Sequence, residues 1–122
     1  MASLYEIVGG RDWFVDLIDR FYDGIESDPI VRPLYPEDLT ESRAHMVGFL
    51  VQYWGGPGTY SEQRGHPRLR MRHSPFAIGL AERNAWLSHM NAAVAAGGLD
   101  ADVEEQVVAY FDNAATHLIN TQ

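Results

Sequence analysis

Apolar residues recur at steps of three and four along much of the chain, the spacing of an amphipathic helix. The first such stretch spans residues 11–27, and its apolar members are Phe14, Leu17, Ile18, Phe21 and Ile25. Asp28 should end this helix, because Pro29 pushes the residue before it out of the helical region. The segment 31–38 holds two prolines and is expected to form an irregular corner that presents Tyr35.

Three more helices are predicted further along. One of about 14 residues begins at Thr40, a suitable N-cap, the next spans residues 80–96, and the last is capped by Asp100 and runs to about residue 120. Glycine pairs follow the first two and should stop them. No alternating strand pattern or hairpin signal appears, so the prediction is an all-α fold with four substantial helices in one domain, residues 1–122.

Two segments between these helices are irregular. Residues 55–67 contain four glycines and two prolines and are predicted to form a long loop, which in a compact domain is usually functional or disordered. The adjoining stretch 66–76, HPRLRMRHSPF, is too short for an independent helix and should hold His73 in a turn between two prolines. We favour a functional role for this region.

Composition narrows the classes of function. The 122 residues carry a formal charge of −8 and no cysteine, which excludes disulfides, thiolate nucleophiles and cysteine-ligated metals and argues against general nucleic-acid binding. No apolar run is long enough to cross a membrane. The first ten residues lack the pattern of a signal peptide, so a cytoplasmic location is expected.

His73 is the first candidate for chemistry, because a rigidly placed imidazole suits metal ligation. The other histidines share no ligand spacing with it, which disfavours a multi-histidine site, whereas haem needs only one axial imidazole from the protein. Haem carries two propionates. An arginine next to the ligand histidine could pair with one of them, and its neighbours in the group Arg64, Arg68, Arg70 and Arg72 would raise the local positive potential. The alternative is a surface histidine among solvated arginines.

Several aromatic and apolar residues could enter a cavity beside such a group. Tyr22, Tyr35 and Trp86 each bring a hydrogen-bond donor on a rigid ring, although any one such residue is more often a core residue with its polar tip at the surface. Met46, Phe49 and Leu50 have helical spacing, which is more often plain core than the wall of a cofactor site.

The chain resembles the group II truncated haemoglobins of bacteria. The likeness lies in LYEIVGG at 4–10, RFYDGIESDPIVRPLYPEDL at 20–39, FLVQYWGGPGTYSEQRGHPRLRMRHSPFAI at 49–78 and ERNAWLSHM at 82–90. The resemblance implies a two-over-two helical sandwich around haem b, with His73 as the proximal ligand of the iron. It also implies cofactor contacts and distal ligand contacts. The cofactor contacts are His73, Arg72, Tyr60, Met46, Phe49, Leu50, Met71, Phe76, Trp86 and His45, and the distal ligand contacts are Tyr22, Tyr35, Trp86 and Ser42.

Two positions depart from the family pattern. His45 stands where relatives often have an arginine that reaches a propionate, so Arg72 is expected to carry more of that anchoring. Ser42 stands where many group II relatives have alanine, and its small hydroxyl should leave ligand access open.

The function implied by the resemblance is binding of O2, and also CO and NO, at a pentacoordinate ferrous iron with a polar distal pocket, for oxygen transport or ligand-linked redox chemistry. An alternative is a haem enzyme that detoxifies NO or acts as a peroxidase, which would need an external reductase because the sequence shows no flavin or nicotinamide domain. A further alternative is a haem-free helical module that docks an acidic partner through its arginines. A homodimer is also left open.

Overall fold

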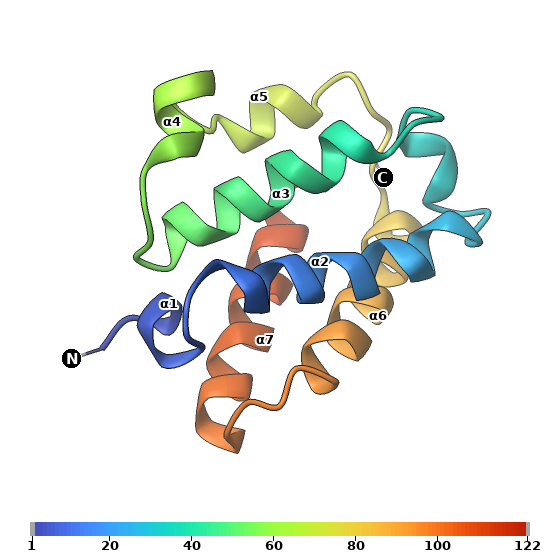
Figure 1. Ribbon diagram of the computed structural model, residues 1–122. Coiled ribbons are helices and arrows are strands. Elements are labelled where there is room, and N and C mark those ends of the chain that lie inside the picture. The colour runs from blue at the N-terminus through green and yellow to red at the C-terminus, as the bar shows by residue number, and fades with distance from the viewer. Residues whose placement is uncertain (1, 122) are drawn as a thin grey trace.

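The computed structural model describes residues 2–121, and the regular elements within that range are all helical (Figure 1). They are α1 (Leu4–Ile7), α2 (Arg11–Glu26), the 3-10 helix η1 (Arg32–Leu34), α3 (Thr40–Tyr53), α4 (Thr59–Arg64), α5 (Leu69–His73), α6 (Leu80–Ala95) and α7 (Ala101–His117). The four long helices predicted from the sequence are confirmed as α2, α3, α6 and α7.

Three short helices were not predicted. Part of the expected loop at 55–67 folds as α4, and His73 is the last residue of α5 rather than part of a turn. The N-terminal helix α1 was also missed, although Ser3 caps it through a hydrogen bond from the Glu6 N–H. These helices have four to six residues, too few to show an apolar period.

The helix starts also differ in detail from the prediction. Leu39, not Thr40, is the N-cap of α3, and the Thr40 N–H donates to the carboxylate of Asp38 at 2.9 Å. Asp100 occupies the N-cap position of α7 without a side-chain capping bond. At α6 the Glu82 carboxylate accepts the N–H of Gly79 at 2.7 Å. An acidic side chain thus caps the starts of α3 and α6, where unpaired N–H groups favour negative charge.

The long helices form two crossed pairs. Helix α2 packs against both α3 and α6, and α6 packs against α7. Figure 1 shows α2 and α3 running across the direction of α6 and α7, which is the expected two-over-two arrangement. None of the helices within residues 2–121 is long and apolar enough to span a membrane.

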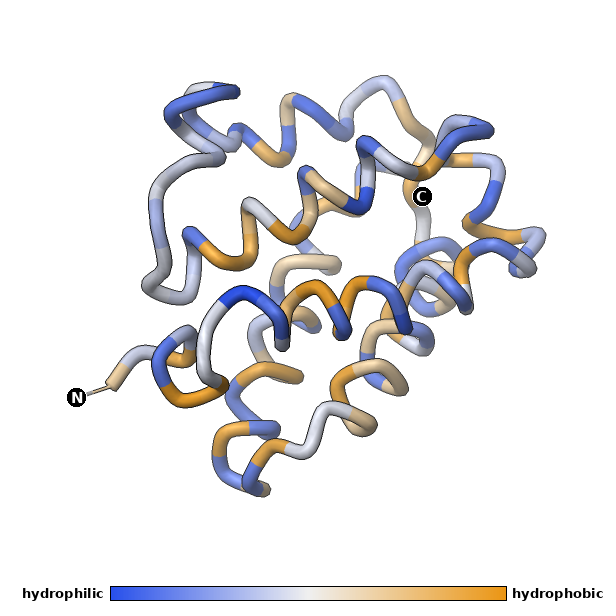
Figure 2. Tube along the Cα trace, viewed as in Figure 1, coloured by the Kyte–Doolittle hydropathy of each residue, from blue (hydrophilic) through white to orange (hydrophobic). Residues whose placement is uncertain are grey.

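The core lies where these pairs meet. All five apolar residues predicted to face inward from α2 are fully buried, and they pack with Met90 and Val94 of α6 and Phe111 of α7. Figure 2 shows apolar and polar positions alternating along the long helices in the same way. Helix α3 differs: its buried residues are Val47, Leu50 and Val51, while Met46 and Phe49 are only partly covered. That second face of α3 borders a cavity.

Candidate functional site

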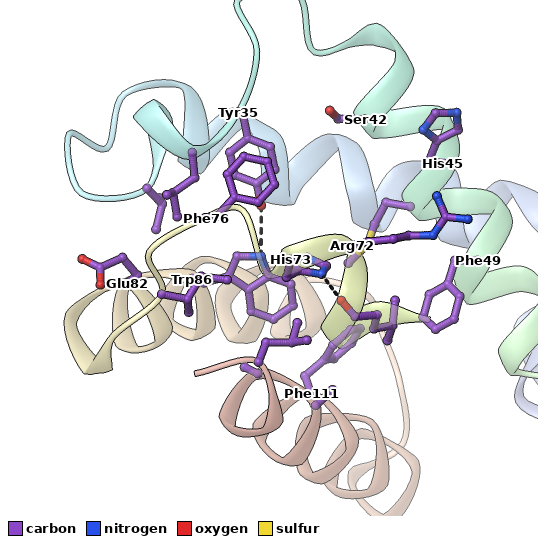
Figure 3. Close-up of a pocket in the computed structure, with 18 of the residues that line it drawn as sticks. Tyr35, Ser42, His45, Phe49, Arg72, His73, Phe76, Glu82, Trp86 and Phe111 are labelled. Carbon is purple, nitrogen blue, oxygen red and sulfur yellow. Dashed lines mark hydrogen bonds between the residues drawn. The ribbon is translucent and has the colours of Figure 1, made fainter. Parts of the chain in front are cut away.

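A cavity of about 370 Å³ lies between α3, α5, α6, α7 and the corner after α2. Figure 3 shows residues from these elements converging on it. The predicted site residues that line it are Tyr22, Tyr35, Ser42, His45, Met46, Phe49, Leu50, Tyr60, Arg72, His73, Phe76 and Trp86. Met71 does not, because its side chain points outward from α5 and is 59% exposed. The structure therefore brings together all the predicted site residues except Met71.

The His73 ring is oriented by its own short helix. Its Nδ1 lies 2.7 Å from the carbonyl oxygen of Leu69, one turn earlier (Figure 3). A carbonyl oxygen only accepts hydrogen bonds, so Nδ1 must carry the proton and Nε2 keeps its lone pair. This is the tautomer that an axial metal ligand needs, with the other ring nitrogen bonded to a backbone carbonyl.

Arg72 holds the backbone segment that precedes α5 in the sequence. Its Nε donates to the carbonyl of Pro67 at 2.7 Å, and its Nη2 donates to the carbonyl of Arg64 at 3.0 Å. The guanidinium thus ties the end of α4 to the start of α5. Arg72 shapes the cavity wall in addition to lining it.

Asn120, which the sequence analysis missed, holds the backbone that follows α5. Its side-chain amide donates to the carbonyls of His73 and Phe76, at 3.3 and 2.8 Å, and its carbonyl oxygen accepts the N–H of Ile78 at 2.9 Å. The Asn120 N–H also donates to the Ile78 carbonyl at 2.8 Å. The segment after α7 therefore fixes the connection from His73 to α6, and no local sequence pattern signals this contact across 42 or more residues.

Another part of the cavity lining is aromatic and carries polar groups. The Trp86 indole N–H donates to the Tyr35 hydroxyl at 3.2 Å (Figure 3). The Tyr35 ring meets that of Tyr22 edge to face, with the ring centroids 5.6 Å apart. Burial raises the pKa of Tyr35 to about 12, and burial followed by the nearby Tyr35 raises the pKa of Tyr22 well above its ordinary value. Both phenols therefore keep their protons at neutral pH and can donate them.

The cavity mouth is basic. Arg64 donates from Nη1 to His45 Nε2 at 2.8 Å and lies over the ring of Tyr60. Burial, followed by the positive charge of Arg64, lowers the pKa of His45 below its usual 6.5. His45 is therefore neutral at pH 7, and the cations that line the mouth on this side are Arg64 and Arg72. Arg64 belongs to the arginine group visible in the sequence, but its place in the site was not predicted.

The remaining walls are apolar residues that the sequence analysis did not assign to the site. The main ones are Leu69, Ile78, Tyr110, Phe111 and Leu118. On α7 they have the same spacing as core residues, so no sequence signal separates the two roles. Within residues 2–121, no three His, Asp or Glu side chains gather to hold an ion, so a metal here would have fewer than three such ligands.

These features match the demands of a haem group. A largely apolar cavity suits the porphyrin, the Nε2 of His73 suits the iron, and Arg64 and Arg72 at the mouth suit propionates. The residues present therefore fit a haem held by one axial histidine.

Comparison with known proteins supports the assignment of a haem site. The family model described as bacterial-like globin matches residues 3–120. A group 2 truncated hemoglobin of Bacillus subtilis is 40% identical over 116 residues, which cover 95% of this chain and 87% of the relative. The crystal structure of a thermostable hemoglobin from the actinobacterium Thermobifida fusca superposes with a TM-score of 0.94 at 51% identity, covering 97% of both chains. The X-ray structure of a truncated oxygen-avid haemoglobin from B. subtilis superposes with a TM-score of 0.90 at 39% sequence identity. The match covers 97% of this chain and 99% of that one.

Fold and site define a helical protein of the globin class. The chain belongs to the group II truncated haemoglobins, as its sequence resemblance indicated. It is accordingly a haem globin that binds diatomic ligands, and its family implies haem as the cofactor.

Proposed function

We propose that this globin binds O2 at the ferrous iron of haem b, with His73 as the one protein ligand and with tyrosine hydroxyls that retain the bound gas. One observation carries the proposal. The same cavity is lined by an imidazole whose neutral tautomer leaves Nε2 free and, from other elements, by the hydrogen-bonded Trp86–Tyr35 pair.

The haem would be held by His73 and would supply an iron that takes O2, CO or NO. Trp86 donates its only N–H to Tyr35, so the Tyr35 hydroxyl accepts one bond and keeps its own proton for another acceptor. A hydroxyl that accepts a hydrogen bond becomes a better donor. We therefore assign Tyr35, together with Tyr22, as the donor to the outer atom of the ligand, and Trp86 as the residue that orients and polarises Tyr35.

This arrangement favours O2 over CO. Haem would present O2 to these donors as a partly anionic acceptor, whereas CO would carry much less charge. Preorganised donors in a site with little water stabilise such charge more than they would in bulk solvent. The B. subtilis relative described as oxygen-avid is consistent with this assignment.

The role of His73 is tested by replacing it with glycine. The purified parent protein should show a Soret band after haem reconstitution and a five-coordinate ferrous spectrum. His73→Gly should lose haem faster, and added imidazole should restore a histidine-like spectrum by filling the vacated space.

His66→Gly is the matched control, because His66 is an exposed histidine of the same segment whose Nδ1 only accepts a backbone N–H. It should retain haem like the parent. An unchanged ferrous CO spectrum and haem affinity in His73→Gly would mean that another histidine ligates the iron. Absence of a Soret band in the parent would instead favour the haem-free interaction module.

Redox chemistry on NO or peroxide is the second candidate, favoured by the donors described above. If they slow O2 release, the protein suits retention and reaction of the gas better than bulk delivery. Mixing the O2-loaded protein with NO should then yield nitrate, with repeated turnover only when an external reductant is present. Rapid O2 release without nitrate formation would favour storage or transfer.

A further inference from the structure

Charge is distributed unevenly over the molecule. Residues 59–79 carry four arginines and one glutamate, a formal charge of +3. The whole chain carries −8, so the remaining residues together carry −11. The basic segment contains α4 and α5, and it therefore includes both the proximal histidine and one rim of the cavity.

Two of the four arginines have roles inside the site and two do not. Arg64 contacts His45, and Arg72 holds the backbone. Arg68 and Arg70 are exposed, and within residues 2–121 neither side chain takes part in an ion pair or a hydrogen bond. Neither is needed to explain the cavity.

The backbone at Arg68 is unusual as well. Among residues 2–121 it is the one non-glycine with positive φ, at +46°, in the left-handed region that L-residues seldom adopt. Such conformations concentrate at functional sites. Three residues after it, on α5, Met71 exposes 59% of its surface beside Arg70. An exposed apolar side chain among cations is typical of a docking surface.

We infer that the exposed side chains of Arg64, Arg68, Arg70 and Met71, the basic face, dock an acidic redox protein that delivers electrons to the haem. This inference rests on the proposed function and adds to it a protein partner, identified by its negative charge. In the transfer, one electron leaves a reduced flavin of the partner and ferric iron becomes ferrous, with no other bond made or broken. Within this chain, α5 links the basic face directly to His73.

The charge balance favours a compact acidic protein over an extended polyanion. A nucleic acid or an anionic membrane would also meet the strongly acidic remainder of the molecule, which would repel it. A partner the size of a small domain can cover the basic face alone. Complementary charge of this kind raises association rates and makes them sensitive to salt.

The test uses the ferric haem protein and an acidic flavodoxin as the probe. Reduction by flavodoxin hydroquinone is followed by stopped flow from low to high ionic strength, with dithionite as a small reductant in parallel. The parent rate with flavodoxin should fall about tenfold as salt rises. The double variant Arg68→Gln/Arg70→Gln should be about 3- to 10-fold slower at low salt and unchanged with dithionite.

The matched control changes net charge by the same amount elsewhere. Asn91→Asp/Gln106→Glu also adds two negative charges, at exposed positions on the distant ends of α6 and α7 (Figure 1), and should keep the parent rate within about twofold. Isothermal titration of flavodoxin into the ferric protein should show binding that is weakened only in the arginine variant.

The remaining outcomes each count against the inference. Equal flavodoxin rates in all three proteins, with normal reduction by dithionite, overturn the docking surface and leave the proposed function intact. Failure of the parent to bind haem overturns both. The parent protein could also bind phosphatidylglycerol vesicles or duplex DNA more tightly than flavodoxin. If the arginine variant lost that binding, the basic face would be assigned to a polyanion instead.

Discussion

The two walls of the cavity are stabilised by different interactions. The wall proposed as distal is backed by buried rings: Phe21 is fully buried, and its ring centroid lies 5.0 Å from those of both Tyr22 and Trp86. On the side proposed as proximal, no residue between 61 and 78 is buried, and side-chain bonds to backbone carbonyls hold the chain in place. Apolar burial should therefore decide the stability of the distal wall, and a few hydrogen bonds that of the proximal wall.

This difference suggests that the two walls affect different properties of the protein. Segments with few buried contacts open locally at lower free energy than core helices. We therefore expect changes in the proximal segment to alter haem retention with little effect on global folding. Changes in the distal wall should alter stability or ligand release.

The largest effect should come from removing a distal core ring. Phe21→Ala leaves a cavity between Tyr22 and Trp86 and should lower the free energy of unfolding by about 3 to 5 kcal/mol, measured by urea denaturation. Met71→Ala on the proximal side removes an exposed side chain and should change it by less than about 0.5 kcal/mol. Similar losses in the two variants would contradict the contrast between the walls.

Next in size is the effect of the distal donors on ligand release. A hydrogen bond to a charged acceptor contributes about 1.5 to 3 kcal/mol, so Tyr35→Phe should speed O2 release by about 10- to 100-fold, measured by displacement with CO. Trp86→Phe removes the bond that orients Tyr35 and should act in the same direction. CO release should change much less in either variant.

Tyr53→Phe is the control for this pair, since Tyr53 is half exposed and outside the cavity. Its O2 release should match that of the parent. Changes under about twofold in both Tyr35→Phe and Trp86→Phe would show that these residues do not act on the ligand.

A smaller effect is expected at the tail that holds the proximal segment. Asn120→Ala removes three side-chain hydrogen bonds at an exposed site, and a net loss of about 1 kcal/mol should speed haem loss roughly fivefold. Amide hydrogen exchange at residues 74–79 should accelerate while exchange in α2 stays unchanged. Asn113→Ala, an exposed change on α7 just before this tail, is the control, and equal haem loss from both would assign Asn120 no role.

The smallest effect is a pH dependence at the cavity mouth. The pKa of His45 is lower in the folded protein than its usual 6.5, so neutral His45 stabilises the folded state. This contribution to stability is complete above pH 6.5 and is lost as the pH falls through the lowered pKa. Protonation removes the lone pair that Arg64 uses and places two cations side by side. At this partly exposed pair the effect should be below about 1 kcal/mol.

The comparison variant is His45→Gln, whose side-chain oxygen can still accept from Arg64 at any pH. Below pH 6.5 the thermal midpoint of the parent should fall more steeply than that of His45→Gln, by up to a few degrees. Parallel pH profiles would mean that the His45–Arg64 contact does not contribute to stability.

Much of the fold could be predicted because helix formation leaves a local trace. The stripe from Phe14 to Ile25 identified α2, and glycine pairs marked the ends of α3 and α6. The irregular stretch around His73 was correctly singled out, but its short helices were not predicted, because α5 has too few residues to show a period. The apolar pattern also could not say that Met46 and Phe49 border a cavity while Val47 is buried core.

The sequence by itself determined the long helices, the globin family and the residue types available to the site. Only the tertiary structure decided how those residues are used: the indole of Trp86 donates to Tyr35, Arg72 bonds to backbone carbonyls, and Asn120 holds the chain after His73. The physical reason is distance along the chain. Helical periodicity is set by neighbours three and four positions apart, whereas the Trp86–Tyr35 and Asn120–His73 bonds join residues 51 and 47 positions apart and exist only once the helices have packed.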